Sequence, residues 1–278
     1  MSGSLRVLDQ DDLPELRALL RRDPVSNLFV ASRVATSGLA PEFLGCPIYG
    51  YFDAGELVAA CHVGANLVPI GEHPDALSAF ARAIGPRRQV SSIMGPAGAV
   101  LQLHRELCGR WGSSWIASRD IRAHQPLMMI DSDPATASDP RVRRVTAADY
   151  EPYLVAAIAM YTEEVGVSPL DSSNSYQRYV RMLIQLGRAF GAVHDDHVWF
   201  KADVGSAWGT YCQVQGVWLA PGLRGKKMSA PAMAQVVRLC RERFGVVSLY
   251  VNDYNTRARR LYESIGFQTV GELATVLY

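Results

Sequence analysis

Two groups of residues toward the end of the chain have types and spacing suited to binding a phosphate-bearing ligand and moving a proton. The first is a basic, glycine-containing turn, Pro221–Lys227, between an apolar run and an amphipathic segment. Backbone N–H groups at a helix N-terminus, beside arginine and lysine, favour phosphate groups. The second is Tyr262, in a later helical segment, whose hydroxyl can exchange a proton with a ligand held at the turn.

The segments between these groups predict a strand–helix–strand–helix order. Apolar residues recur at helical spacing from Ser229 to Phe244, Pro231 suits a first helical turn, and Gly245 is typical of a helix end. The β-rich run 246–251 follows, and Asn255 or Thr256 can cap a second helix that ends at Gly266. This order predicts parallel strands with a right-handed crossover.

Both segments resemble the signatures of the GNAT acyltransferase superfamily. Pro221-Gly222-Leu223-Arg224-Gly225 is similar to its acetyl-CoA loop, and Leu249–Asn255, continuing to Tyr262 and Phe267, is similar to its other signature. The family loop reads Arg-x-x-Gly-x-Gly/Ala, whereas this chain has Lys227 and Ser229 where small residues are expected. Lys227 either meets the phosphates or turns outward. The resemblance implies an α/β fold with a mixed sheet, and acetyl-CoA as co-substrate held where parallel strands splay.

The resemblance also implies particular site residues. A backbone N–H near Leu219 would stabilise the oxyanion, and Tyr262 would protonate the departing thiolate. The predicted acetyl-CoA-binding residues are Val217, Trp218, Leu219, Arg224, Gly225, Lys226, Lys227, Met228, Ser229, Asn252, Asn255, Arg259 and Tyr262.

The general base is less well defined. Many members of the family carry a carboxylate on the strand before the loop, but 209–218 contains none. Glu163 and Glu164, at the end of a predicted helix, are the nearest candidates, and the alternative is a water chain ending on glutamine or backbone groups. His194-Asp195-Asp196-His197 fits a hairpin turn better than a metal site, so we expect no metal.

Composition limits the class of protein. The chain has 278 residues, 49% hydrophobic and 20% charged, with a formal net charge of +1, which describes a globular protein without the basic excess of a nucleic-acid binder. No apolar run is long enough to span a membrane, and no signal-peptide core follows Met1. The five cysteines are widely spaced, which favours reduced thiols in a cytoplasmic protein.

The chain repeats a plan around a linker. Segment 131–140, rich in proline, aspartate and small residues, separates predicted domains 1–130 and 141–278. A short strand and a capped helix start at Leu5–Leu13, and the same order recurs at Val142–Tyr150. A hairpin about 53–56, a helix at 74–84, a strand at 90–94 and a helix at 99–110 continue the parallel. No Arg-Gly follows Pro69, so the chain resembles bacterial tandem GNAT proteins with a degenerate N-terminal half that does not bind coenzyme A; the alternative is an unrelated α/β domain.

The C-terminal residues predict a shared strand. After Gly266 only twelve residues remain, too few for the two antiparallel strands and loop that end the family's sheet. We therefore expect 267–278 to form one strand, with His124–Ile130 of the N-terminal half as its partner.

Three functions remain open. The first is an N-acetyltransferase acting by direct attack of an amine on acetyl-CoA in a ternary complex. The second is an acyl or aminoacyl transferase using another donor, and the third is a non-catalytic acetyl-CoA-binding regulator. Tyr262 favours an enzyme over a regulator, since a sensor needs no acid for a thiolate. The acceptor, whether a small molecule or a protein amine, and the oligomeric state have no readable motif.

Overall fold

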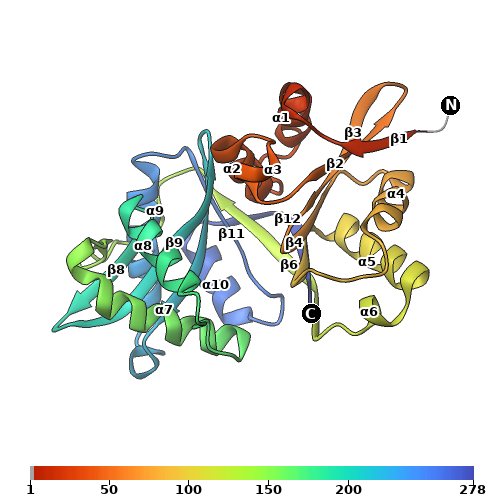
Figure 1. The fold of residues 1–278 in the computed structure, drawn as a ribbon. Helices are drawn as coiled ribbons and strands as arrows, with labels where there is room; N and C mark the ends of the chain where they lie inside the picture. Colours follow the sequence, from red (N-terminus) through yellow and green to blue (C-terminus); the bar gives the residue numbers. More distant parts are fainter. Residues whose placement is uncertain (1–2) are drawn as a thin grey trace. The chain divides into compact units, whose positions relative to one another are not determined.

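The computed structural model describes residues 3–278 (Figure 1). By their internal contacts these residues form two compact units. Unit 1 contains the chain up to Leu127 together with Tyr250–Tyr254 and Val270–Tyr278, and unit 2 contains Met128–Leu249 and Asn255–Thr269. The domain limits predicted above follow sequence pattern rather than contacts, and they stay predictions.

Unit 1 is a mixed sheet flanked by helices. Its strands are β1 (Ser4–Val7), β2 (Ile48–Asp53), β3 (Glu56–Val63), β4 (Asn66–Ile70), β5 (Ser92–Pro96) and most of β6 (Asp120–Ile130) and β12 (Gln268–Leu277). Its helices are α1 (Leu13–Arg21), α2 (Leu28–Ser37), α3 (Pro41–Leu44), α4 (Pro74–Ile84), α5 (Ala97–Trp111) and α6 (Ser113–Ile116). The strand order is β1-β2-β3-β4-β5-β12-β6, in which β4 and β5 run parallel and β5 and β12 antiparallel.

The predicted hairpin and helices of the N-terminal half are present, but the strand predicted at 90–94 is β5, which runs from Ser92 to Pro96. Strands β2 and β3 form the hairpin, and α4 has the predicted bounds. Apolar residues of α4 and α5, among them Leu77, Phe80 and Leu103, are fully buried in one hydrophobic cluster. This burial, rather than helix propensity, fixes both helices on the sheet.

The predicted C-terminal strand is also confirmed. Strand β12 pairs with β5 from Leu273, opposite Pro96, to Leu277, opposite Ser92. On its other side lies β6, which contains the predicted partner segment. Thr275 Oγ1 donates to Gln125 Oε1 over 2.7 Å between these two strands. The last strand therefore completes a sheet otherwise built from the N-terminal part of the chain.

Unit 2 also contains parallel and antiparallel strands with helices. Its strands, in order, are the end of β6, β11 (Val246–Tyr250, to Leu249 in this unit), β10 (Tyr211–Leu219), β9 (His197–Trp208), β8 (Ala189–His194) and β7 (Arg143–Arg144). Its helices are α7 (Tyr150–Val165), α8 (Ser175–Gln185), α9 (Ser229–Arg241) and α10 (Thr256–Ile265). Strands β10 and β11 are parallel, whereas β8, β9 and β10 are antiparallel.

Helices α9 and α10 form where the sequence predicts them. The buried residues of α9 include Met233, Val236, Val237 and Cys240, which lie on one stripe. Helix α10 begins after Asn255, whose side chain accepts the Ala258 N–H over 3.1 Å, and it ends at Gly266 in the left-handed conformation.

The same arginine–aspartate motif occurs at the two places where the sequence predicts a short strand and a capped helix start. In unit 1, Arg6 donates from Nη1 and Nη2 to both carboxylate oxygens of Asp12, each over 2.6 Å. In unit 2, Arg143 makes the same paired contact with Asp149, over 2.8 Å each. Both carboxylates also close a capping box at the start of a 3-10 turn. The spacing of six residues and the geometry recur together, which favours a duplicated architecture.

Candidate active site

Strand β10 departs from regular pairing where it carries predicted site residues. Its register with β9 shifts between Gln215 and Trp218, and Gly216 has a φ of +58°. Pairing with β11 covers Tyr211–Gln213 against Val246–Ser248. Among the described residues of unit 2, the rest of β10, with Val217 and Leu219, has no β11 partner. Its backbone polar groups on that side are therefore available to a ligand.

The turn after β10 combines positive side chains with the start of a helix. Arg224, Lys226 and Lys227 are exposed, and α9 begins at Ser229 with Met228 as its N-cap. The first-turn N–H groups of a helix have no acceptor within it, and the helix dipole adds partial positive charge there. The turn is therefore a site suited to a phosphate group.

Lys227 has a left-handed backbone conformation at the position where the family pattern has glycine. Its φ is +57°, and Gly225, two residues earlier, has a φ of +85°. A left-handed conformation at a non-glycine residue costs about 1–2 kcal/mol, so the loop retains this shape against a local cost. The Lys227 side chain is exposed.

Glu163, at the end of α7, joins β10 and the basic turn. Its Oε1 accepts the Trp218 indole N–H over 3.0 Å, and its Oε2 accepts Arg224 Nη2 over 2.6 Å. Arg224 Nε also donates to the Leu219 carbonyl over 3.0 Å. One candidate base and the main candidate for binding phosphate are thus bonded to each other.

This contact changes the acidity of Glu163. Partial desolvation pushes its pKa up, but hydrogen bonds from Trp218 and Arg224, with the arginine charge, together hold the pKa below its ordinary value. Glu163 is therefore ionised at neutral pH, and loss of either the Trp218 or the Arg224 contact would raise its pKa.

Tyr262, on α10, is 7% exposed and packs against Phe267, with ring centroids 5.8 Å apart. Burial, and then the negative charge of Glu164, raise the pKa of its hydroxyl well above the ordinary value. The hydroxyl therefore stays protonated at neutral pH and can donate a proton. Across residues 3–278 it has no hydrogen-bond partner in the protein.

The remaining predicted residues divide between the units. Asn255 and Arg259 lie in unit 2, where Asn255 caps α10 and the buried Nε of Arg259 has no hydrogen-bond partner among the described residues. Asn252 lies in unit 1, where its side chain bonds Gln125 and Tyr254 over 2.8 Å each. Of the residues predicted to bind acetyl-CoA, all but Asn252 therefore lie in unit 2.

Sequence reasoning missed a buried charged group beneath the β10 shift. Lys201, with no exposed surface, donates from Nζ to Asp203 Oδ2 over 2.6 Å and to the Gly216 carbonyl over 3.0 Å. Asp203 Oδ1 accepts the Tyr153 hydroxyl over 2.6 Å. Lys201 thus satisfies the carbonyl that the register shift removes from the β-ladder. Two charges in an otherwise apolar strand were the available signal.

Aromatic side chains from α7 and α8 gather beside this group. Tyr161 and Tyr176 meet edge to face with centroids 5.5 Å apart, and Tyr179 lies 6.4 Å beyond Tyr176. Gln215 Nε2 donates to the Tyr179 hydroxyl over 2.6 Å. Burial first, and Asp203 next, raise the pKa of Tyr179 to about 12. Neutral aromatic faces near a carboxylate suit a cationic amine.

Comparison with protein families agrees with this geometry. Residues 187–267, which contain β10, the basic turn and α10, match the acetyltransferase (GNAT) family. Residues 187–267 are a GNAT domain. Residues 46–153 match a domain of unknown function, DUF4081. A search of curated proteins finds no match.

Solved structures share the fold over the whole chain. An acetyltransferase of the GNAT family from Colwellia psychrerythraea aligns with a TM-score of 0.59 at 12% identity, covering 99% of each chain. A GCN5-related N-acetyltransferase from Sphaerobacter thermophilus gives 0.62 at 15%, covering 99% of this chain and 94% of that one. A tandem GNAT protein from the clavulanic acid biosynthesis pathway gives 0.55 at 13%, covering 99% and 98%. The GNAT-like fold therefore extends beyond the matched domain.

The GNAT domain and the N-terminal half differ at the phosphate loop. Between β4 and α4 the chain reads Gly71-Glu72-His73, with an acidic residue where the GNAT domain has Arg224 and lysines.

The His194–His197 segment is the β8–β9 hairpin turn, with Asp195 and Asp196 both left-handed. Within residues 3–278, no group of three His, Cys, Asp or Glu side chains is arranged to hold a metal ion. No described helix is both long and apolar enough to cross a membrane.

Proposed function

We propose that the protein is an N-acetyltransferase that transfers the acetyl group of acetyl-CoA to an amine by direct attack in a ternary complex. The observation that carries the proposal is the end of β10, which leaves its β11 partner and leads into a basic turn and a helix N-terminus. Such an end offers backbone donors to a carbonyl and positive charge to a pyrophosphate at once.

The residues present fit acetyl-CoA. Arg224, Lys226 and Lys227 would meet its phosphates with the first-turn N–H groups of α9, and Arg259, whose buried Nε lacks a partner among the described residues, is a further donor. When bound, acetyl-CoA supplies an activated thioester. The chain's part is to bind, orient and exchange protons.

Binding of the phosphates would compete with Glu163 for Arg224. A guanidinium that turns to a phosphate leaves Glu163 with only the Trp218 indole as hydrogen-bond donor. The loss of a positive neighbour raises the pKa of a carboxylate, which makes it a better base. Glu163 would thus accept the proton of the amine only after the donor has bound, which favours an ordered reaction.

Tyr262 would act at the other end of the reaction. Its raised pKa keeps the hydroxyl protonated, and this hydroxyl has no acceptor among the described protein atoms. A protonated phenol in that state can give its proton to a departing thiolate. Glu164, whose charge contributes to the raised pKa, is the second carboxylate candidate for the base.

Two other functions are kept as alternatives. An acyl or aminoacyl transferase with another donor would use the same loop, and Lys227 and Ser229 are the residues that depart from the acetyl-CoA pattern. A non-catalytic regulator would bind acetyl-CoA without turnover. The unpartnered, protonated Tyr262 hydroxyl favours an enzyme. We also propose a small-molecule or protein amine as acceptor, with no nucleic acid or membrane partner, and a cytoplasmic location.

The experiment is calorimetry of the full chain with acetyl-CoA, followed by an amine panel monitored by release of free thiol. We expect binding that is lost in Arg224→Ala and retained in the control Arg87→Ala, an exposed arginine of unit 1. Binding with thiol release supports the transferase. Binding without release from any amine favours the regulator, and no binding at millimolar acetyl-CoA contradicts the proposal.

A further inference from the structure

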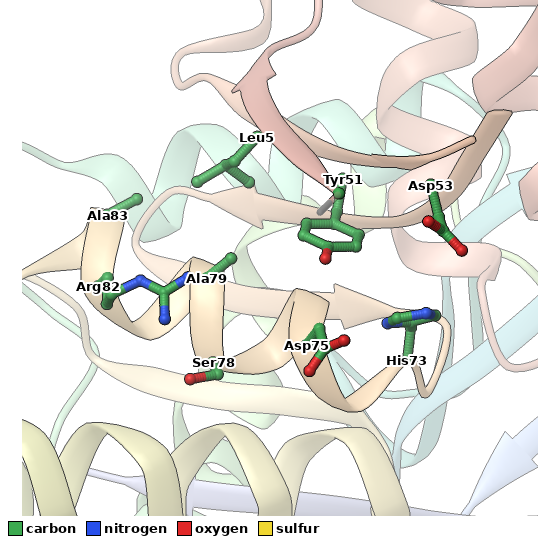
Figure 2. A pocket seen from close by; sticks show the side chains of 10 residues that line it. Leu5, Tyr51, Asp53, His73, Asp75, Ser78, Ala79, Arg82 and Ala83 are labelled. Carbon is green, nitrogen blue, oxygen red and sulfur yellow. The ribbon is translucent and has the colours of Figure 1, made fainter. Parts of the chain in front are cut away.

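One pocket is lined entirely by residues of unit 1. It is open, has a volume of about 700 Å³, and lies between β1, the end of β2 and one face of α4 (Figure 2). Its lining includes Tyr51, Asp53, His73, Asp75 and Arg82. These residue types are polar or charged, so the pocket is built for a hydrated, charged ligand rather than for an apolar one.

Two residues that line this pocket, Tyr51 and His73, carry polar atoms without a partner among the described protein atoms. Tyr51 is 6% exposed, and its hydroxyl makes no hydrogen bond to any described protein atom. Figure 2 shows the hydroxyl directed toward α4. A side chain at Gly3 would overlap this oxygen, so the glycine keeps the space open. The buried Nδ1 of His73, whose ring is 5.3 Å from that of Tyr51, also lacks a partner. A buried polar atom without a partner, such as this nitrogen, is rare, and a ligand can satisfy it.

The charges of the pocket are separated along α4. Asp75 lies in the first turn of this helix and Arg82 in its last turn, on the same face, while Asp53 and His73 lie at the Asp75 end (Figure 2). Seven residues of helix correspond to about 10 Å. Within residues 3–278, none of Asp53, Asp75 and Arg82 forms an ion pair with another residue. The pocket thus holds two unpaired carboxylates at one end and an unpaired guanidinium at the other.

We propose that this pocket binds an extended zwitterion, with a primary ammonium at Asp53 and Asp75 and a carboxylate at Arg82. Guanidinium groups bind carboxylates through paired hydrogen bonds, and an ammonium group needs the acceptors that the two aspartates supply. The α-amino and α-carboxyl groups of one amino acid are too close together to reach both ends. The ligand class is therefore a diamino acid, an ω-amino acid or a short peptide.

The N-terminal half thereby has a role that needs no coenzyme A. Its β4–α4 turn carries Glu72 in place of a basic loop, so the pocket is not a second acetyl-CoA site. The proposal concerns unit 1 alone and is independent of the transferase activity.

The test is calorimetry on the full chain without acetyl-CoA, using 6-aminohexanoate and L-lysine as probes. Hexanoate and hexylamine, which each carry one of the two charges, are the controls. We expect the zwitterions to bind at least about tenfold more tightly than either control, because a charged hydrogen-bonding partner is lost with each missing group. No binding of either zwitterion at millimolar concentration would overturn the proposal.

Variants locate the binding. Arg82→Met and Asp75→Asn change exposed residues, and each should weaken binding of 6-aminohexanoate about tenfold. Arg87→Met, another exposed arginine of unit 1, should leave it unchanged. Since the probe is also an amine, Glu163→Gln tests the acceptor site of the GNAT domain and should have no effect. If Glu163→Gln weakens binding, or if Arg82→Met and Asp75→Asn do not, the probe binds elsewhere and the proposal fails.

Discussion

Arg224 of the basic turn donates to Glu163 of α7 over 2.6 Å, although the first is the best candidate for binding phosphate and the second a candidate for accepting a proton. The two side chains are 40% and 43% exposed, so the pair is weakly stabilising and readily broken. The pair links two events, because a ligand that binds the Arg224 guanidinium also releases the Glu163 carboxylate from it.

Removing the competing carboxylate should strengthen acetyl-CoA binding. Glu163→Gln leaves Arg224 without its charged partner, and an exposed ion pair is worth about 0.2–1 kcal/mol, so we expect affinity to rise by a factor of about 1.4 to 5. Turnover should fall if Glu163 is the base. Calorimetry and steady-state rates measure both, with Glu151→Gln, an exposed glutamate at the start of α7, as control. Weaker acetyl-CoA binding in Glu163→Gln would contradict the competition.

The Tyr262 hydroxyl should matter for turnover and not for binding. Tyr262→Phe keeps the ring packed on Phe267, so acetyl-CoA affinity should stay near that of the original protein while kcat falls on the order of 10²-fold. Because the pKa of Tyr262 is raised, the original enzyme should show no loss of rate from this group below about pH 10. Unchanged turnover in the variant would make Tyr262 a packing residue.

Breaking the buried pair should destabilise unit 2 strongly. Lys201→Met leaves Asp203 buried without its cation, which costs about 3–5 kcal/mol for such pairs. The double variant Lys201→Met/Asp203→Leu should be more stable than Lys201→Met alone, because no unpaired charge remains. Urea unfolding of both single variants and the double variant measures the coupling. If the loss of unfolding free energy in the double variant equals the sum of the losses in the two single variants, Lys201 and Asp203 act independently.

The capping carboxylate of unit 2 should make stability depend on acid pH. The hydrogen bond from Arg143, opposed by desolvation and supported by Thr146, holds the pKa of Asp149 well below its ordinary value. A carboxyl whose pKa is lower in the folded state than in the unfolded state stabilises the fold at pH values above its unfolded-state pKa, near 4. This stabilisation is lost as the pH falls toward the pKa of the folded state. Asp149→Asn should therefore cost about 1 kcal/mol at pH 7 and progressively less toward pH 3.

Urea unfolding at pH 7, 5 and 3 checks this, with Asp131→Asn, an exposed aspartate, as control. If the two proteins differ in free energy of unfolding by the same amount at every pH, the effect of Asp149→Asn comes from side-chain shape and not from charge.

The C-terminal half should not fold without the N-terminal residues. In a fragment 141–278, residues Val270–Leu277 of β12 lose both neighbouring strands, β5 and β6. Unpaired strand edges with apolar residues such as Leu273 and Val276 promote association. We expect an aggregating fragment without a cooperative thermal transition by circular dichroism. A soluble fragment that unfolds cooperatively would show that β12 is dispensable.

Much of the fold was readable from periodicity and from chain length. The bounds of α4, the stripe of α9 and the cap at Asn255 follow from local sequence, and β12 followed from the twelve residues left after Gly266. These features depend on neighbours in sequence or on simple counting, which a single sequence contains.

The site was predictable only in part, because its key contacts join distant residues. Glu163 could be found as a carboxylate at a helix end, but not its bond to Arg224, 61 residues away. Lys201 and Asp203 stand in the sequence as two charges in an apolar strand, yet their meaning depends on a register shift in the next strand. The GNAT motif includes the loop and does not include Lys201 or Asp203, so the resemblance gives no indication of this pair.

The place of β12 in unit 1 has a consequence for synthesis on the ribosome. Strands β5 and β6 are made well before the strand that lies between them, because all of Arg143–Ile265 is translated in the interval. At roughly 5–20 residues per second, β5 and β6 wait several seconds or more for the strand that joins them. During that time the facing edges of β5 and β6 are open to nascent neighbours and to chaperones. Slow codons or a stalled ribosome before Gln268 would therefore leave the N-terminal strands, which are made first, open to misfolding. This would happen although every residue of the GNAT loop had already been translated.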